Sequence, residues 1–159
     1  MRSLLIGYGN PSRRDDGAAL HVVNAWRARQ GQPGLTPETD GWEDLGSAQD
    51  SLFLQQLTPE LAALLAQYDR VAFVDTALPE TGEPVRVHRL TPSYRLSVVS
   101  HHMTPETLLA LAGQLYGRQP EGYLVSIHGH DFGFGDRLSP ETEAAVPEAV
   151  ERVASLMAV

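Results

Sequence analysis

The stretch that decides the fold is GYGNPSRRDDG, residues 7–17, which follows the apolar run SLLI at residues 3–6. An apolar run that ends in a glycine-containing turn is typical of a buried strand that leads into a helix. From residue 16 to about residue 29, apolar side chains recur at helical spacing, and either Asp15 or Asp16 could cap the start of that helix. The opening of the chain is therefore predicted to form a β–α unit.

The rest of the chain continues this alternation. Strands are predicted at residues 40–43, 70–75, 84–90 and 123–127, and helices at residues 58–67, 104–116 and 139–157. Each of the three helices begins with a Thr-Pro or Ser-Pro pair, a capping residue followed by a proline that suits the first turn. Residues 84–90 are expected near the sheet edge, and Pro147 is expected to kink the last helix. The pattern predicts an α/β domain with a mostly parallel sheet of about five strands and helices on both faces.

Length and composition narrow the class of protein. A chain of 159 residues fits one domain, so residues 1–159 are expected to form a single unit. No apolar run approaches the roughly 18 residues of a membrane span, and the N-terminus passes directly into a strand pattern, so a cytoplasmic protein is expected and no membrane partner. The net charge of −8 makes nucleic acid an unfavourable partner. The absence of cysteine leaves oxygen and imidazole for any chemistry.

Acidic and imidazole side chains are predicted to meet at one edge of the sheet. Asp16 follows the first strand, Asp75 ends the strand at residues 70–75, and His101 and His102 stand in the loop before the helix that begins at Thr104. Ligands of parallel sheets bind beyond the carboxyl ends of the strands. Two carboxylates and one imidazole form a mixed oxygen and nitrogen site that suits a divalent cation such as Zn or Ni and leaves open positions.

The same residues have other interpretations. A dinucleotide site is disfavoured because Ser12 occupies the third glycine position of G-x-G-x-x-G and paired acids would repel a pyrophosphate. Both aspartates could cap the helix, although one cap needs one carboxylate. Asp75 could accept loop amides, and the histidine pair could be solvated. A serine triad is disfavoured because no buried acid and oxyanion-loop pattern accompanies Ser100.

Further histidines are assigned to lesser roles. His128 and His130, with Asp131, follow the strand at residues 123–127 and are expected to line the cleft rather than to bind a metal. His21 lies in the first predicted helix and His88 in the predicted edge strand, and both are expected to be structural.

Four blocks of sequence together resemble the [NiFe]-hydrogenase maturation endopeptidases. They are GYGNPSRRDDG at residues 7–17, FVD at 73–75, SHH at 100–102 before LLALA, and DFGFGDRLSPETEAAVPEAV at 131–150. The blocks occur in the family's order and span nearly the whole chain. The resemblance implies an α/β enzyme that removes a C-terminal extension from the hydrogenase large-subunit precursor after nickel insertion.

The resemblance also implies roles for individual residues. The nickel-recognising positions correspond to Asp16, Asp75 and His101, with either carboxylate able to serve as the general base, and Asp15 is then left to cap the helix. The nickel is recognised in the precursor, and Zn or Cd is expected to substitute in the isolated protein. Residues expected to contact the substrate are Gly9, Asn10, His102, His128 and His130.

Two departures from the family pattern qualify the assignment. The family often carries two glycines after the second strand, where this chain reads DGWEDLGSAQD at residues 40–50, and QQLTPELA at residues 55–62 is similar to members that serve bidirectional, soluble hydrogenases. Asp16 stands where the family often has glutamate. A nickel- or precursor-binding chaperone without protease activity is the main alternative, and a nucleotide-binding switch protein is a less favoured one.

Overall fold

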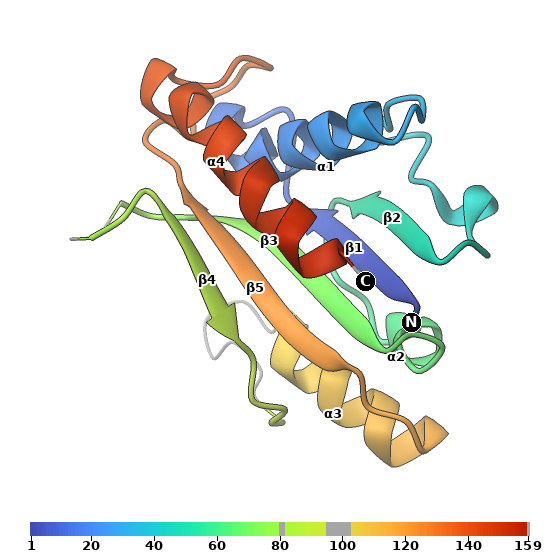
Figure 1. Cartoon of the computed structure of the whole chain (residues 1–159). Coiled ribbons are helices and arrows are strands. Elements are labelled where there is room, and N and C mark those ends of the chain that lie inside the picture. The colour runs from blue at the N-terminus through green and yellow to red at the C-terminus, as the bar shows by residue number, and fades with distance from the viewer. Residues whose placement is uncertain (80–81, 95–102, 159) are drawn as a thin grey trace.

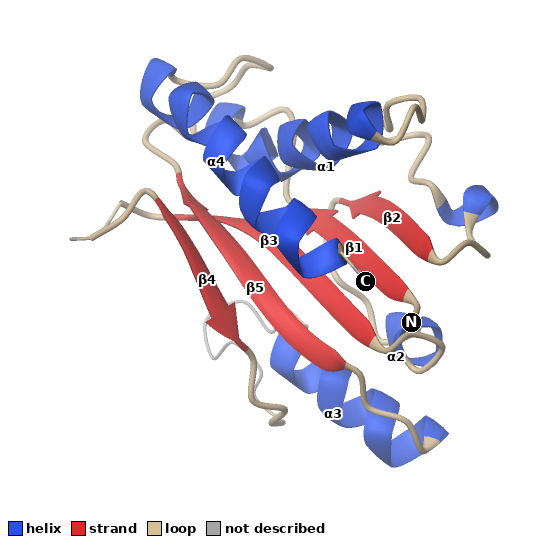
Figure 2. Cartoon of the chain, in the orientation of Figure 1, coloured by secondary structure: helices blue, strands red, loops and turns tan. Residues whose placement is uncertain are grey.

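The computed structural model describes residues 1–79, 82–94 and 103–158. A five-stranded sheet with the order β2-β1-β3-β5-β4 lies at its centre (Figures 1 and 2). The strands are β1 (Ser3–Tyr8), β2 (Gln49–Leu54), β3 (Arg70–Ala77), β4 (Val85–Arg89) and β5 (Glu121–His128). The α-helices are α1 (Ala18–Arg29), α2 (Leu61–Leu65), α3 (Pro105–Tyr116) and α4 (Pro140–Met157), and the 3-10 helices are η1 (Arg14–Gly17) and η2 (Trp42–Asp44).

The sheet is parallel except at one edge. β1 pairs in parallel with β2 and β3, and β3 pairs in parallel with β5. β4 runs antiparallel to β5 and forms the outer strand, as its alternating pattern predicted. The α/β fold with a mostly parallel sheet is therefore confirmed, and the carboxyl ends of β1, β2, β3 and β5 lie at the same edge.

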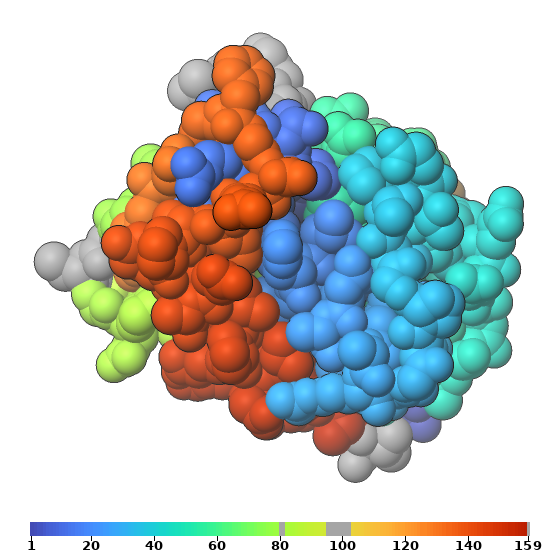
Figure 3. All heavy atoms as spheres, turned by 90° about the horizontal axis from the view of Figure 1, so that it is seen from above, coloured from blue at the N-terminus to red at the C-terminus, as the bar shows by residue number. Residues whose placement is uncertain are grey.

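Helices cover both faces of the sheet, as predicted. α1 and α4 pack on one face, and α2 and α3 lie on the other (Figure 1). Seen from above, α1 and α4 lie side by side as the outer layer (Figure 3). No helix in the described ranges has the length and apolar character needed to cross a membrane.

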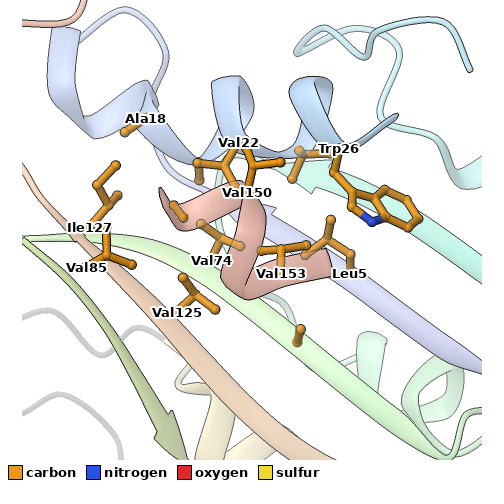
Figure 4. Packing of buried hydrophobic residues seen from close by; sticks show 14 of the residues in the cluster. Leu5, Ala18, Val22, Trp26, Val74, Val85, Val125, Ile127, Val150 and Val153 are labelled. Atoms are coloured by element: carbon orange, nitrogen blue, oxygen red, sulfur yellow. The ribbon is translucent and has the colours of Figure 1, made fainter. Parts of the chain in front are cut away.

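Each face of the sheet has its own apolar core because successive strand residues point to opposite sides. Under α1 and α4, Leu5 and Val74 join side chains that include Val22 and Val150 (Figure 4). Under α2 and α3, the neighbouring strand residues Leu4, Ile6, Val71 and Phe73 join leucines from both helices. This alternation also decides which face the last residues of each strand point to.

The predicted caps of the two long C-terminal helices are present. The hydroxyl of Thr104 accepts a hydrogen bond from the Thr107 amide at 3.2 Å, and the hydroxyl of Ser139 accepts one from the Thr142 amide at 3.4 Å. The helix expected at residues 58–67 is shorter, because α2 has only five residues and Glu60 precedes it without a side-chain cap. Pro147 lies inside α4 without ending it.

The strand predicted at residues 40–43 is wrong. Gly41 has a φ of 92°, in the left-handed region, and the Asp40 side chain accepts a hydrogen bond from the Trp42 amide at 2.9 Å, so the chain turns into η2 instead. The second strand follows at Gln49–Leu54. The sequence did not predict this strand because its first half is polar. Asp50 and Ser51 are buried but do not have the apolar character expected of a central strand.

Candidate functional site

Asp75 and Tyr8 are neighbours at the carboxyl edge of the sheet. Gly7 of β1 pairs with Val74 of β3, so the next residues of both strands, Tyr8 and Asp75, point to the side of α2 and α3. The Tyr8 hydroxyl donates a hydrogen bond to Asp75 Oδ2 at 3.1 Å. Asp75 is half-buried. The prediction that Asp75 comes at the end of a central strand, at this edge, is confirmed.

Asp16 is held in place by the turn that follows β1. Its Oδ2 accepts a hydrogen bond from the Asn10 amide at 2.7 Å. Gly9 has a φ of 149°, and a Cβ added there would lie 2.1 Å from the carbonyl oxygen of Asp16. Only glycine allows this close approach. Gly9 and Asn10, which were predicted to contact substrate, thus have a demonstrable role in positioning the Asp16 carboxylate.

The loop that carries Asp16 is tied directly to the strand that carries Asp75. The Thr76 hydroxyl donates a hydrogen bond to the Asp15 carbonyl oxygen at 2.8 Å. Thr76 follows Asp75 in the sequence, and Asp15 precedes Asp16. The pKa of Asp75 is raised to about 6, mainly by burial and to a smaller extent by the charge of Asp16, against the hydrogen bonds from Tyr8 and the Thr76 amide, which lower it. The Thr76–Asp15 hydrogen bond therefore links the two segments one residue away from each predicted metal-facing carboxylate.

Tyr8 keeps its proton at this site. Burial, followed by the charge of Asp75, raises the pKa of the Tyr8 phenol far above its ordinary value, and the charge of Glu106 at the start of α3 acts in the same direction. The hydroxyl is therefore a hydrogen-bond donor toward Asp75 at any physiological pH. Sequence reasoning missed Tyr8, although its position two residues after the buried Ile6 would have placed it on the same face as Asp75.

Asp15 has a different role from the predicted one. The residue before α1 is Gly17, which makes no side-chain cap, so Asp15 does not cap that helix. Its carboxylate is fully buried and anchors the loop after β5 and the start of α4. It accepts hydrogen bonds from the amides of His130 at 2.7 Å, Asp131 at 2.9 Å and Ser139 at 2.7 Å, and from the hydroxyls of Ser139 at 2.6 Å and Thr142 at 2.9 Å.

These hydrogen bonds decide the ionisation of Asp15. Burial by itself would raise the pKa of the carboxyl, but the hydrogen bonds from Ser139, His130 and Asp131 outweigh it and hold the pKa well below its ordinary value. Asp15 is thus an ionised structural group. Asp15 is therefore structural, as predicted, but it supports the start of α4 instead of capping α1. That Asp16 faces a metal stays a prediction.

Four histidines lie in the described ranges, and none of them forms a hydrogen bond or ion pair with Asp16 or Asp75. His128 ends β5 and is buried, and its carbonyl oxygen accepts a hydrogen bond from the Thr142 hydroxyl at 2.8 Å. The His130 side chain is exposed, and its backbone amide binds Asp15. His21 and His88 are exposed, so neither packs in a core as a structural histidine would.

The third predicted ligand cannot be placed. Ser100, His101 and His102 lie outside the described residues. Among residues 1–79, 82–94 and 103–158, no group of three histidine, aspartate or glutamate side chains is arranged to hold a metal ion. The donor chemistry nevertheless fits a cation, because carboxylate oxygens are ligands for divalent metals and a positive charge would offset the burial of Asp75.

A hollow lies beside the end of β2. It has a volume of about 400 Å³ and is lined by Trp42, Leu54, Gln55 and Gln56 among others. The Gly9 amide donates a hydrogen bond to the Leu54 carbonyl oxygen at 3.2 Å, which links this hollow to the turn that holds Asp16. The hollow therefore lies on the same side of the sheet as the turn after β1, and neither Asp16 nor Asp75 lines it.

Comparisons with known proteins support the fold. Neither the protein-family models nor the curated protein sequences include a match to this chain. Among solved structures, the hydrogenase maturating endopeptidase HybD from E. coli is similar with a TM-score of 0.64 and 21% identity, over 98% of this chain and 91% of that one. The [NiFe] hydrogenase maturation protease HybD from Thermococcus kodakarensis is similar with a TM-score of 0.65 and 21% identity, over 99% of this chain and 100% of that one.

A third solved structure, an endopeptidase from Escherichia coli, has a TM-score of 0.68 and 19% identity over 99% of this chain and 92% of that one. The likeness covers almost the full length of every protein compared. At these identities it establishes that the chain has the fold of hydrogenase maturation endopeptidases.

Proposed function

We propose that this protein is a [NiFe]-hydrogenase maturation endopeptidase that removes the C-terminal extension from a nickel-loaded large-subunit precursor. The observation that supports the proposal is the hydrogen bond of 2.8 Å from the Thr76 hydroxyl to the Asp15 carbonyl oxygen, which joins the neighbours of Asp75 and Asp16 at the carboxyl edge of the sheet. This is where parallel sheets bind ligands. The fold shared with HybD proteins supports the same assignment.

In this proposal the nickel belongs to the substrate. The precursor's own ligands hold the ion, which docks against Asp16, Asp75 and the predicted imidazole of His101 and so fixes the extension at the site. His102, His128 and His130 are proposed to line the approach. Zn or Cd would occupy the same carboxylates in the isolated protein. The proposal includes a cytoplasmic location. It also includes a bidirectional, soluble hydrogenase as the source of the precursor, which residues 55–62 suggest.

Asp75 is the better-supported general base. A carboxyl with a pKa of about 6 is ionised at neutral pH and still accepts a proton readily. Water adds to the scissile carbonyl carbon and passes a proton to Asp75, and that proton then goes to the leaving amine as the peptide bond breaks. Asp16 shares the docking of the ion.

The test is incubation of the protein with a large-subunit precursor, followed by intact-mass measurement of the precursor. A nickel-loaded precursor is expected to lose its C-terminal peptide, whereas the metal-free precursor in chelator is expected to keep it. Binding of the loaded precursor without any loss of mass would favour the alternative, a precursor-binding chaperone. Equal cleavage of both precursors would show that nickel does not gate the reaction.

A further inference from the structure

The hydroxyl of Tyr8 singles out one oxygen of Asp75. It donates to Asp75 Oδ2 at 3.1 Å from the last residue of the neighbouring strand. The Tyr8 ring packs against the apolar core under α2 and α3, so its position is set by β1 and by that core. A donor whose position is set by the sheet therefore fixes the orientation of the Asp75 carboxylate.

We propose that Tyr8 is a positioning residue for the endopeptidase site, which holds Oδ2 of Asp75 so that the carboxylate meets the substrate's metal through its other oxygen. The inference rests on the proposed function, because it takes Asp75 as a group that faces the metal. Carboxylates that bind metals are commonly oriented by such hydrogen bonds from neighbouring groups. Asp16 is oriented in the same way, because the Asn10 amide donates a hydrogen bond to its Oδ2 at 2.7 Å.

The chemistry of a tyrosine suits this task better than that of a basic residue. An arginine or lysine partner would orient Asp75 but would also neutralise it and repel an incoming cation. A phenol donates one hydrogen bond and carries no charge. Tyr8 therefore fixes the geometry of the carboxylate and leaves its negative charge available to the metal.

The chain contains a matched control for this interaction. The Tyr68 hydroxyl donates to Asp50 Oδ2 at 2.5 Å, and both residues are buried. Asp50 lies at the beginning of β2, at the opposite edge of the sheet from Asp75, and also pairs with Arg2 at 3.3 Å. Replacing Tyr68 by phenylalanine removes the same kind of hydrogen bond far from the proposed site.

The test is calorimetric titration of the isolated protein with cadmium, using wild type, Tyr8→Phe and Tyr68→Phe. Both variants keep the aromatic ring, and melting curves verify that they fold. Tyr8→Phe is expected to weaken cadmium binding by about 10-fold or more, the usual effect of removing a group that orients a ligand. Tyr68→Phe is expected to bind cadmium as the wild type does, because distant sites act independently.

Several results would overturn the positioning role. They are unchanged cadmium affinity in Tyr8→Phe, an equal loss in Tyr68→Phe, and failure of the wild type to bind cadmium. In the same variants, cleavage of the nickel-loaded precursor is expected to fall in Tyr8→Phe and to persist in Tyr68→Phe. If the wild type binds cadmium and Tyr8→Phe weakens that binding, but no precursor is cleaved, the proposed function fails and the role of Tyr8 toward Asp75 stands.

Discussion

Replacing Asp75 by asparagine is expected to stabilise the protein while it removes the proposed activity. Asp75 has a pKa of about 6, against an ordinary value of 3.8, because burial and the charge of Asp16 both disfavour its ionised form. The folded state therefore binds the proton more tightly than the unfolded state. Its stability falls as the pH rises between these two values, and the rise from 3.8 to about 6 corresponds to at most ~3 kcal/mol of unfolding free energy.

Asparagine resembles the protonated acid, accepts the Tyr8 hydrogen bond and does not ionise. Above about pH 7, Asp75→Asn is expected to unfold at a higher urea concentration than wild type by the equivalent of up to ~3 kcal/mol, and at about pH 3, below both pKa values, the two are expected to be equally stable. The exposed Asp136, replaced by asparagine, serves as the control and should show no such pH-dependent difference. A difference between Asp75→Asn and wild type that is constant with pH, or a variant less stable than wild type at pH about 8, would refute the reasoning.

Three further substitutions test the rest of the site. Asp15→Asn is expected to lower the unfolding free energy by about 3–5 kcal/mol in urea denaturation, because an amide group would face the five donors that now bind a buried carboxylate. A loss below about 1 kcal/mol would contradict this role. Gly9→Ala should abolish cadmium binding in calorimetry, because the added Cβ would lie 2.1 Å from the Asp16 carbonyl oxygen. The control Gly31→Ala should retain cadmium binding, because no atom lies within 4 Å of the added Cβ. Cadmium binding by both variants would show that the turn at Gly9 tolerates the methyl group. His101→Ala should stop precursor cleavage in the intact-mass assay with little change in melting temperature, whereas His102→Ala should keep most activity, because successive side chains of an extended loop point to opposite sides; the reverse pattern would reassign the imidazole.

Much of the fold could be predicted because its signals are local. The apolar run before residue 7, the run at residues 70–75 and the Thr-Pro and Ser-Pro pairs before α3 and α4 are set by burial and by capping, which act within a few residues. The placement of Asp75 followed from these signals. Once a strand is recognised as parallel and central, its carboxyl end must lie at the edge where ligands bind.

The remaining features depend on contacts between distant segments. Asp15 is next to α1 in sequence, but its hydrogen-bond donors come from residues more than a hundred positions away, in the loop after β5 and at the start of α4, so sequence spacing suggested the wrong helix. Asp50, near the start of β2, is buried because Arg2 and Tyr68 donate hydrogen bonds to it. The periodicity of apolar residues does not predict such partners. Tyr8 could have been placed by alternation along β1, whereas its hydrogen bond to Asp75 depends on the pairing of β1 with β3.

The most direct test of the central claim compares wild type with Asp75→Asn on a nickel-loaded large-subunit precursor, with the precursor's mass measured after incubation. Because the variant is expected to be at least as stable as wild type at neutral pH, loss of activity in it cannot be attributed to unfolding. The account predicts that wild type releases the C-terminal peptide and that Asp75→Asn leaves the precursor at full mass. Release of the peptide by Asp75→Asn at the wild-type rate would contradict it.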